Sequence, residues 1–434
     1  MGDAAWKIIL RSENGNSEGR RQIPALVWTL GAMPVKSGLV CRSLWRLTKW
    51  MRLNRRSFLG KIGIASAAGA VGSVLEPRRI QAAPLERPAD LPQPEQRSIA
   101  EIARAFMDRF KVPGMAIAIS KDGKLVLEQG FGVADTATKA PVTPQHLFRI
   151  ASVTKPFTSA AIFALIEQGR LRLEDFVFGE KGGLGFDFGK NPPERVMEIT
   201  VAHLLTHTCG GWANNGEDPM FQNPAMSHSA LIEWAIKTYP LTHKPGTAYA
   251  YSNFGYCILG RLIEKLTGLP YAQAVRREVL AKCGITTMRI AGNTLAERAP
   301  GEVTYHANGS GDPYGMNVAR MDSHGGWIAT TGDLVQFAMR VDGFSNPPDI
   351  LRAETLKTMT TPSAASEHYA CGWAVNKVPN WWHTGSLPGT ASIMVRTASG
   401  LCWAALTNIR AEGIGGALDE TMWKIAKAVP AWRA

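Results

Sequence analysis

The sequence predicts an α+β fold in which N- and C-terminal strands form one antiparallel sheet, flanked by helices, around a mostly helical insertion. Two strand-like runs lie early, within residues 114–135, and four short ones lie late, within residues 369–408. Between them, residues 170–360 combine helical patterns with long loops rich in Gly, Pro and Asn. Strands grouped in this way are typical of α+β domains rather than of alternating parallel-sheet folds.

The individual elements can be placed in chain order. Residues 84–98 are polar and rich in Pro, which predicts a linker, and a helix is expected at about Ile99–Phe110. The two early strands flank Lys121-Asp122-Gly123, whose Asp-Gly pair is a hairpin signal. A second helix is expected to begin near Ser152. A last helix is expected at Gly415–Ala428, so the domain covers residues 99–430.

The positive charge of the chain is concentrated at its N-terminal end. The 434 residues carry a formal net charge of +12. Residues 1–82 hold 14 Lys and Arg against 4 Asp and Glu, whereas the remainder holds 34 against 32. The part expected to fold is therefore nearly neutral, which argues against nucleic acid as a partner.

The basic segment has the order of an export signal. From Met51 it places Arg55 and Arg56 before a small-residue apolar run, Ile62 to Leu75. Residues 51–83 resemble a twin-arginine signal, with processing after Ala82 or Ala83, which predicts the twin-arginine export machinery as a partner and a periplasmic or secreted protein. No stable membrane span is expected from so short a run, although an N-terminal anchor is the alternative. Residues 1–50 are either an over-called upstream extension or a segment without a readable role.

The cysteines indicate neither a disulfide framework nor a zinc site. Five of the six follow the export segment, an odd number, and none has CxxC or Cys/His metal-ligand spacing. Burial as small apolar side chains is the simplest interpretation. The five are Cys209, Cys257, Cys283, Cys371 and Cys402.

Three short motifs carry the chemistry. Ser152 and Lys155 form the only SxxK, and a spacing of three places both side chains on one helix face. Tyr251-Ser252-Asn253 is the only YxN, and His383-Thr384-Gly385 is the only [HK]TG. Each motif alone has a structural alternative: a helix N-cap for the serine, a solvated lysine, core and capping roles for the tyrosine and asparagine, and an ordinary strand-end histidine.

In their order and context these motifs resemble the serine β-lactamase and penicillin-binding superfamily, closest to its class C branch with esterase and D-alanyl-D-alanine carboxypeptidase relatives. The context includes "LLTHTCGG" at 204–211 and "HGGWIATTGDL" at 324–334. The resemblance implies a β-lactamase/transpeptidase-like fold, an acyl-enzyme on Ser152, and an oxyanion hole from the backbone N–H groups of Ser152 and Ser386. It implies no cofactor and no metal. The implied catalytic residues are Ser152, Lys155 and Tyr251, and the implied substrate-binding residues are Asn253, His383, Thr384, Gly385 and Ser386.

The residue types suit this chemistry. Serine needs a base, and Lys155 can act as one only if burial lowers its pKa. A nearby cation is expected to make the Tyr251 hydroxyl more acidic, so that it can pass protons to the leaving group. Asn253 can hydrogen-bond both Lys155 and a substrate amide, and the strand edge at residues 383–386 can pair with an extended substrate.

The substrate is less sharply indicated. The resemblance suggests a small-molecule or peptide substrate, namely carboxyl esters or D-amino-acid peptides, with β-lactam hydrolysis as the alternative. Another alternative is a non-catalytic penicillin- or cell-wall-peptide-binding protein. His383 stands where class C β-lactamases usually carry Lys, which predicts weak attraction for a β-lactam carboxylate and an activity that changes between about pH 5.5 and 8. His207 is expected to be structural, whereas Trp212, Asn214 and Asn215 could line a pocket.

Overall fold

The computed structural model describes residue 86 and residues 88–432. The extension at 1–50 and the export signal at 51–83 lie outside these residues. Seven strands form one sheet in the order β3-β2-β1-β10-β9-β8-β7, and every neighbouring pair is antiparallel. The strands are β1 (Gly114–Lys121), β2 (Lys124–Asp135), β3 (Ala140–Pro141), β7 (Ala374–Val375), β8 (Trp381–Leu387), β9 (Thr390–Arg396) and β10 (Leu401–Thr407).

The centre of the sheet joins the two ends of the domain, as the sequence predicted. β1 pairs with β10, so that Ile117 lies opposite Ala405 and Ile119 opposite Trp403. The predicted hairpin at 121–123 is also present, because β1 runs directly into β2. The α+β assignment and the use of early and late strands in one sheet are therefore confirmed.

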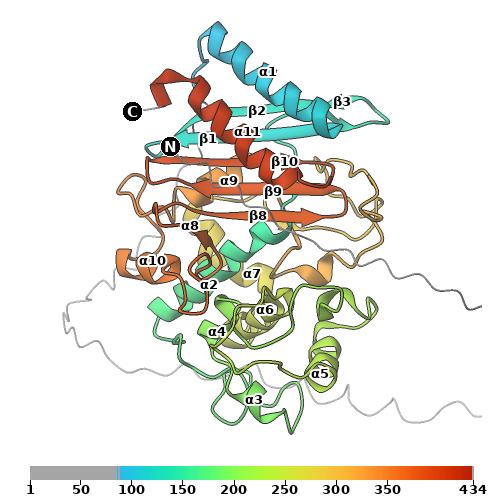
Figure 1. Cartoon of the computed structure of the whole chain (residues 1–434), viewed down its shortest axis with the longest axis vertical. Helices are drawn as coiled ribbons and strands as arrows, with labels where there is room; N and C mark the ends of the chain where they lie inside the picture. The colour runs from blue at the N-terminus through green and yellow to red at the C-terminus, as the bar shows by residue number, and fades with distance from the viewer. Residues whose placement is uncertain (1–85, 87, 433–434) are drawn as a thin grey trace, which may run out of the picture. The chain divides into compact units, whose positions relative to one another are not determined.

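Helices cover both faces of this sheet (Figure 1). Alternate residues of β1 point to opposite faces, so the larger Ile117 and Ile119 pack under the terminal helices α1 (Gln93–Phe110) and α11 (Ile414–Ala428). The smaller Ala116 and Ala118 belong to the core on the other face, where α9 (Thr331–Ala338) lies against β1 and β10. Small side chains on that face let the helical layer approach closely.

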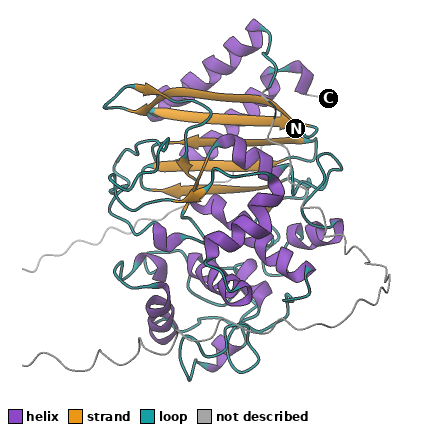
Figure 2. Ribbon diagram, turned by 180° about the vertical axis from the view of Figure 1, so that it is seen from behind, coloured by secondary structure: helices purple, strands orange, loops and turns teal. Residues whose placement is uncertain are grey.

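The insertion between the early and late strands is mostly helical (Figure 2). It also holds a small sheet of three short strands in the order β4-β6-β5. Its helices are α2 (Thr154–Glu167), α3 (Glu194–Met197), α4 (Val201–Leu205), α5 (His228–Thr238), α6 (Asn253–Thr267), α7 (Tyr271–Val275), α8 (Ala281–Cys283), α9 and α10 (Ala353–Thr360). The short strands are β4 (Phe148–Arg149), β5 (Arg289–Ile290) and β6 (Trp327–Ala329). The insertion also has three 3₁₀ turns, η1 (Ala151–Val153), η2 (Pro219–Phe221) and η4 (Ala319–Met321), and a π-helical turn, η3 (Arg276–Leu280). A last 3₁₀ turn, η5 (Pro430–Trp432), follows α11.

The helix α2 is enclosed on all sides, because every residue from Thr154 to Leu165 is buried. Ser152 does not lie within it, although a helix was expected to begin there. It occupies the 3₁₀ turn η1, and α2 begins at Thr154. Pro156 then falls in the first helical turn, where its missing N–H leaves no hydrogen bond unmade.

The predicted linker at 84–98 is partly wrong, because α1 begins at Gln93 rather than at Ile99. The prolines of this segment suggested irregular chain, but Pro92 is the N-cap and Pro94 lies in the first turn, where proline is tolerated. The Gln96 backbone N–H donates to the Pro92 carbonyl at 3.1 Å and starts the helical hydrogen bonds.

The cysteines lie as the sequence analysis expected. The five cysteines among the described residues are all free and buried, as small apolar side chains would be.

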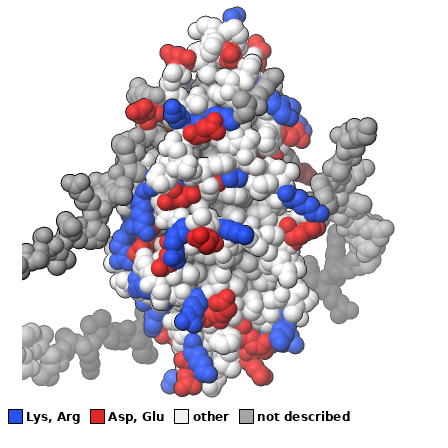
Figure 3. All heavy atoms as spheres, turned by 90° about the vertical axis from the view of Figure 1, so that its left-hand side faces the viewer, with Lys and Arg blue, Asp and Glu red and all other residues white. Residues whose placement is uncertain are grey.

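On the face drawn in Figure 3, acidic and basic side chains are interspersed rather than gathered by sign. No helix within residues 88–432 combines the length and the apolar character that crossing a bilayer requires.

Candidate active site

Ser152 and Lys155 lie in direct contact at the start of α2. The Lys155 Nζ is 3.2 Å from the Ser152 Oγ, so the spacing of three residues brings the two side chains together. Nζ also donates to the Asn253 Oδ1 at 2.8 Å and to the His324 backbone carbonyl at 3.1 Å. Three oxygen atoms therefore surround one amine.

Burial determines the protonation of this amine. Lys155 has no solvent-exposed surface, and desolvation holds its pKa well below that of an ordinary lysine. The charge of Asp218 opposes this shift but does not cancel it. A lysine in this environment can lose its proton nearer neutral pH and serve as a base.

Tyr251 completes the contact group but differs from the prediction in its acidity. Its ring centroid lies 4.7 Å from the Lys155 Nζ and 4.2 Å from the His207 ring. Burial raises the pKa of Tyr251, and hydrogen bonding to Ser152 offsets only part of the rise. The expectation that a nearby cation makes this phenol more acidic is wrong, because burial disfavours the charged phenolate and this effect is the largest one on Tyr251. Tyr251 therefore keeps its proton at neutral pH.

Asn253 is held by a residue that the sequence did not indicate. Its Nδ2 donates to the Asp218 Oδ2 at 2.9 Å, while its Oδ1 faces Lys155. Asp218 is fully buried, and burial raises its pKa to about 6. His207 supports the same segment, because the Ser252 backbone N–H donates to the His207 Nδ1 at 3.1 Å, a structural contact of the kind expected.

The strands β8 and β9 both pack against the turn that contains Ser152. The Ser392 Oγ on β9 donates to the Ile150 carbonyl at 2.7 Å. Gly385 leaves room for this contact, since a Cβ at that position would lie 2.2 Å from the Ser392 Oγ and 2.3 Å from the Ile150 oxygen. Ala151 adopts a φ of 46°, an unusual conformation for a residue with a side chain, immediately before Ser152. The backbone that leads into Ser152 is therefore held by β9 and constrained in conformation at Ala151.

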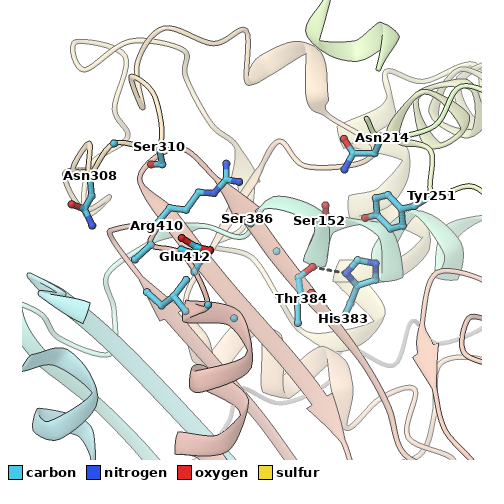
Figure 4. A pocket seen from close by; sticks show the side chains of 17 residues that line it. Ser152, Asn214, Tyr251, Asn308, Ser310, His383, Thr384, Ser386, Arg410 and Glu412 are labelled. Atoms are coloured by element: carbon cyan, nitrogen blue, oxygen red, sulfur yellow. Dashed lines mark hydrogen bonds between the residues drawn. The ribbon is translucent and has the colours of Figure 1, made fainter. Parts of the chain in front are cut away.

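All these elements open into one cavity of about 850 Å³. Ser152, Tyr251 and residues 383–386 line one side (Figure 4). Arg410 and Glu412 project from the opposite side, near the loop that carries Asn308 to Ser310. The strands β8 and β10 both run antiparallel to β9, so their ends lie at the same edge of the sheet and bring residue 410 to the cavity.

Comparison with known proteins agrees with this geometry. The profile of the beta-lactamase family, described as "Beta-lactamase", matches residues 99–427, which is more than half of the chain. The chain belongs to the beta-lactamase family. The match takes in all three motifs, and the family's mixed α+β fold is the one described above.

Two relatives and one solved structure show how similar this beta-lactamase family chain is to known proteins. Protein flp of Staphylococcus aureus (strain MRSA252) is 26% identical over 316 residues, 69% of this chain and 60% of its own length. Penicillin-binding protein 4* of Bacillus subtilis (strain 168) is 24% identical over 333 residues, 70% of this chain and 69% of that protein. The structure of D-amino acid amidase from Ochrobactrum anthropi SV3 has a TM-score of 0.64 at 22% identity, and covers 78% of this chain and 99% of that one. The chain thus spans less than two thirds of the length of flp, and the likeness to the amidase is one of fold.

His383 does not behave as the sequence suggested. It is 4% exposed, its Nε2 lies 3.0 Å from the Tyr369 hydroxyl, and its Nδ1 lies 2.6 Å from the Thr384 carbonyl oxygen. Burial, with a further contribution from the charge of Lys155, lowers the pKa of His383 to about 3. The expected change of His383 charge between pH 5.5 and 8 is therefore wrong, because this ring stays neutral throughout that window.

Of the three loop residues that the sequence suggested for the pocket, Asn214 lines the cavity and Asn215 is not part of the lining. Trp212 is buried, and its Nε1 donates to the Tyr239 carbonyl. Other cavity residues carried no sequence signal. Arg410 and Glu412 follow the last strand without any motif around them. No group of three or more His, Cys, Asp or Glu among residues 88–432 is arranged to hold a metal ion.

Proposed function

We propose that this chain is an exported serine hydrolase that forms an acyl-enzyme on Ser152 and acts on carboxyl esters or D-amino-acid peptides. The observation that carries the proposal is the 3.2 Å contact between the Lys155 Nζ and the Ser152 Oγ at the wall of an open cavity. A buried amine beside a hydroxyl that faces substrate can activate this hydroxyl as a nucleophile, whereas a protein that binds peptides without reacting with them has no need of the pair.

The proposed reaction consumes substrate and water. Neutral Lys155 accepts the Ser152 proton as Oγ forms a bond to the carbonyl carbon of the substrate, and the oxyanion is held by the Ser152 and Ser386 backbone N–H groups. Tyr251, which is protonated, donates to the leaving oxygen or nitrogen and recovers a proton from the Lys155 ammonium. Collapse releases the alcohol or amine and leaves an ester on Ser152. Water then attacks that ester, with the same groups working in reverse, and frees the acid.

A panel of substrates tests the proposal. The purified chain would be assayed with p-nitrophenyl esters, nitrocefin and peptides ending in D-Ala-D-Ala, and its mass followed for an acyl adduct on Ser152. Hydrolysis of esters or peptides faster than nitrocefin is the expected result. Preference for nitrocefin would instead identify a β-lactamase. A stable adduct without turnover would identify a penicillin- or peptide-binding protein.

Charge in the cavity gives a prediction about the substrate. Among the described lining residues Arg410 is the one Lys or Arg and Glu412 the one carboxylate, while His383 is neutral. Arg410→Gln is expected to lower kcat/KM for a p-nitrophenyl ester with a distal carboxylate by roughly two- to fivefold relative to a neutral ester of equal length. Glu412→Gln is the matched variant and should shift the ratio the other way. Both shifts should shrink at high salt, and a constant ratio in both variants would remove this pair from substrate selection.

Export makes a separate prediction. If residues 51–83 are a twin-arginine signal, the native protein is expected to begin near Ala83 or Pro84, because the basic charge and the apolar run both precede that point. N-terminal sequencing of protein from the native host measures this directly. A mature chain that still carries Arg55 and Arg56 would contradict cleavage.

A further inference from the structure

A buried carboxylate is connected to the nucleophile through two intervening residues, Asn253 and Lys155. Asp218 precedes the turn η2 and has no exposed surface. Its Oδ1 accepts the Met220 backbone N–H at 2.9 Å, and its Oδ2 accepts the Asn253 Nδ2 at 2.9 Å. Both oxygens are thus engaged, one with the loop and one with the amide that contacts Lys155.

This carboxylate determines which way the Asn253 amide points. An ionised carboxylate can only accept hydrogen bonds, so it selects the NH₂ end of Asn253 and turns the oxygen toward Lys155. A second oxygen beside the Lys155 Nζ is that of the His324 backbone carbonyl, at 3.1 Å, and a carbonyl oxygen can also only accept a hydrogen bond. Two of the three neighbours of the amine are therefore fixed acceptors.

The number of hydrogens on the amine then decides its geometry. A neutral lysine has two N–H bonds and one lone pair. With Asn253 and His324 each taking one N–H, the lone pair is left facing the third neighbour, the Ser152 Oγ at 3.2 Å. That is the orientation in which Lys155 can remove the serine proton.

We propose that Asp218 is a positioning residue for this site: by fixing the Asn253 amide, it directs the Lys155 lone pair at Ser152. The inference rests on the proposed function, because it assigns Lys155 the role of base. Asp218 touches neither the nucleophile nor the cavity; it acts through Asn253.

The loop that carries Asp218 is itself clamped. Arg320 is 5% exposed and donates to four backbone carbonyls just after Asp218. Those carbonyls belong to Met220, Gln222, Asn223 and Met226, at 2.6 to 3.0 Å. The Arg320 guanidinium therefore holds the loop after Asp218 to the segment that leads to His324. This contact keeps the distance between the two acceptors of Lys155, the Asn253 Oδ1 and the His324 carbonyl, constant.

The charges around the amine make the role measurable. The negative charge of Asp218 raises the pKa of Lys155 against the effect of burial. The other titratable groups that face Lys155 are neutral near pH 7, since burial raises the pKa of Tyr251 and Tyr256 and lowers that of the three histidines. The histidines are His207, His324 and His383. Asp218 is therefore the group whose charge controls the pH at which Lys155 becomes a base.

The test is the pH dependence of Ser152 labelling by a fluorophosphonate probe, together with kcat/KM for a neutral ester. Asp218→Asn keeps the size of the side chain but offers one oxygen in place of two, so either Met220 or Asn253 loses its acceptor. We expect kcat/KM to fall roughly ten- to hundredfold. We also expect the rise of labelling with pH to move to lower pH, because the charge that favours the ammonium is gone. Glu217→Gln, at the exposed neighbour, should change neither quantity.

The outcomes are distinguishable. A folded Asp218→Asn protein whose labelling rises at the wild-type pH would overturn the proposal, since a merely structural role lowers rate without moving that rise. If Asp218→Asn does not fold, Asp218→Glu is the deciding variant, because it keeps the negative charge. A slower enzyme whose labelling rises at the wild-type pH supports the positioning role of Asp218. A rise of labelling that is displaced to lower pH refutes it. Wild-type protein that neither labels nor hydrolyses any ester would instead defeat the proposed function itself.

Discussion

Replacement of Ser152 by alanine is expected to abolish ester hydrolysis and covalent labelling, with turnover reduced by about 10³-fold or more. The substitution removes the only atom that the proposed mechanism bonds to substrate. The fold should persist, because Lys155 keeps its contacts with Asn253 and His324. Turnover would be followed with a p-nitrophenyl ester, labelling with a fluorophosphonate probe, and folding by thermal denaturation.

A second serine provides the matched control for this experiment. Ser159 lies further along the same helix, is also buried, and donates to the Cys371 carbonyl at 2.7 Å. Ser159→Ala therefore loses the same single oxygen outside the cavity and should retain labelling, even if the protein melts at a lower temperature. Undiminished turnover by folded Ser152→Ala protein would exclude Ser152 as the nucleophile.

Replacement of Lys155 by methionine is expected to lower kcat/KM about 10²- to 10⁴-fold, the usual contribution of a general base. Methionine fills a similar volume without an amine. In the wild type the neutral amine is the active form, and burial holds its pKa well below the ordinary value, so activity should rise as pH increases through that lowered pKa. The variant should lose this rise, which a pH series of kcat/KM would measure.

Two further variants separate Lys155 from other causes. His383→Gln should leave the rise at the same pH whatever it does to the rate, since His383 is already neutral there. Lys181→Met, at an exposed lysine outside the cavity lining, should match the wild type in rate and profile. Persistence of the wild-type pH profile in Lys155→Met would show that the rise belongs to another group.

Local pattern was sufficient for the order of elements and for the residues nearest the nucleophile. Two strand-like runs and the Asp122-Gly123 pair between them predicted the hairpin, and the structure has it at those residues. Ser152 and Lys155 could be paired from sequence because a turn of chain leading into a helix brings residues three apart into contact. The start of α1 was misjudged because Pro92 and Pro94 are compatible both with a linker and with the first turn of a helix.

The electrostatics of the site could not be obtained in this way. The contacts that set them join residues far apart in the chain: Lys155 with Asn253, Asn253 with Asp218, and Lys155 with His324. The prediction for Tyr251 assumed a charged neighbour, and the prediction for His383 assumed a solvated ring. Both assumptions fail in a buried site, where desolvation outweighs the attraction of nearby charges.

The sequence by itself determined the α+β class and the order of the elements. It also located the three motifs that the sheet edge and the helices α2 and α6 bring together. Only the tertiary structure decided that Lys155 is desolvated, that Asp218 orients Asn253, and that Arg410 and Glu412 face the nucleophile across a cavity. The reason is physical: periodicity and turn chemistry act over a few residues, whereas pKa values and the lining of a cavity depend on which distant segments exclude water from the same place.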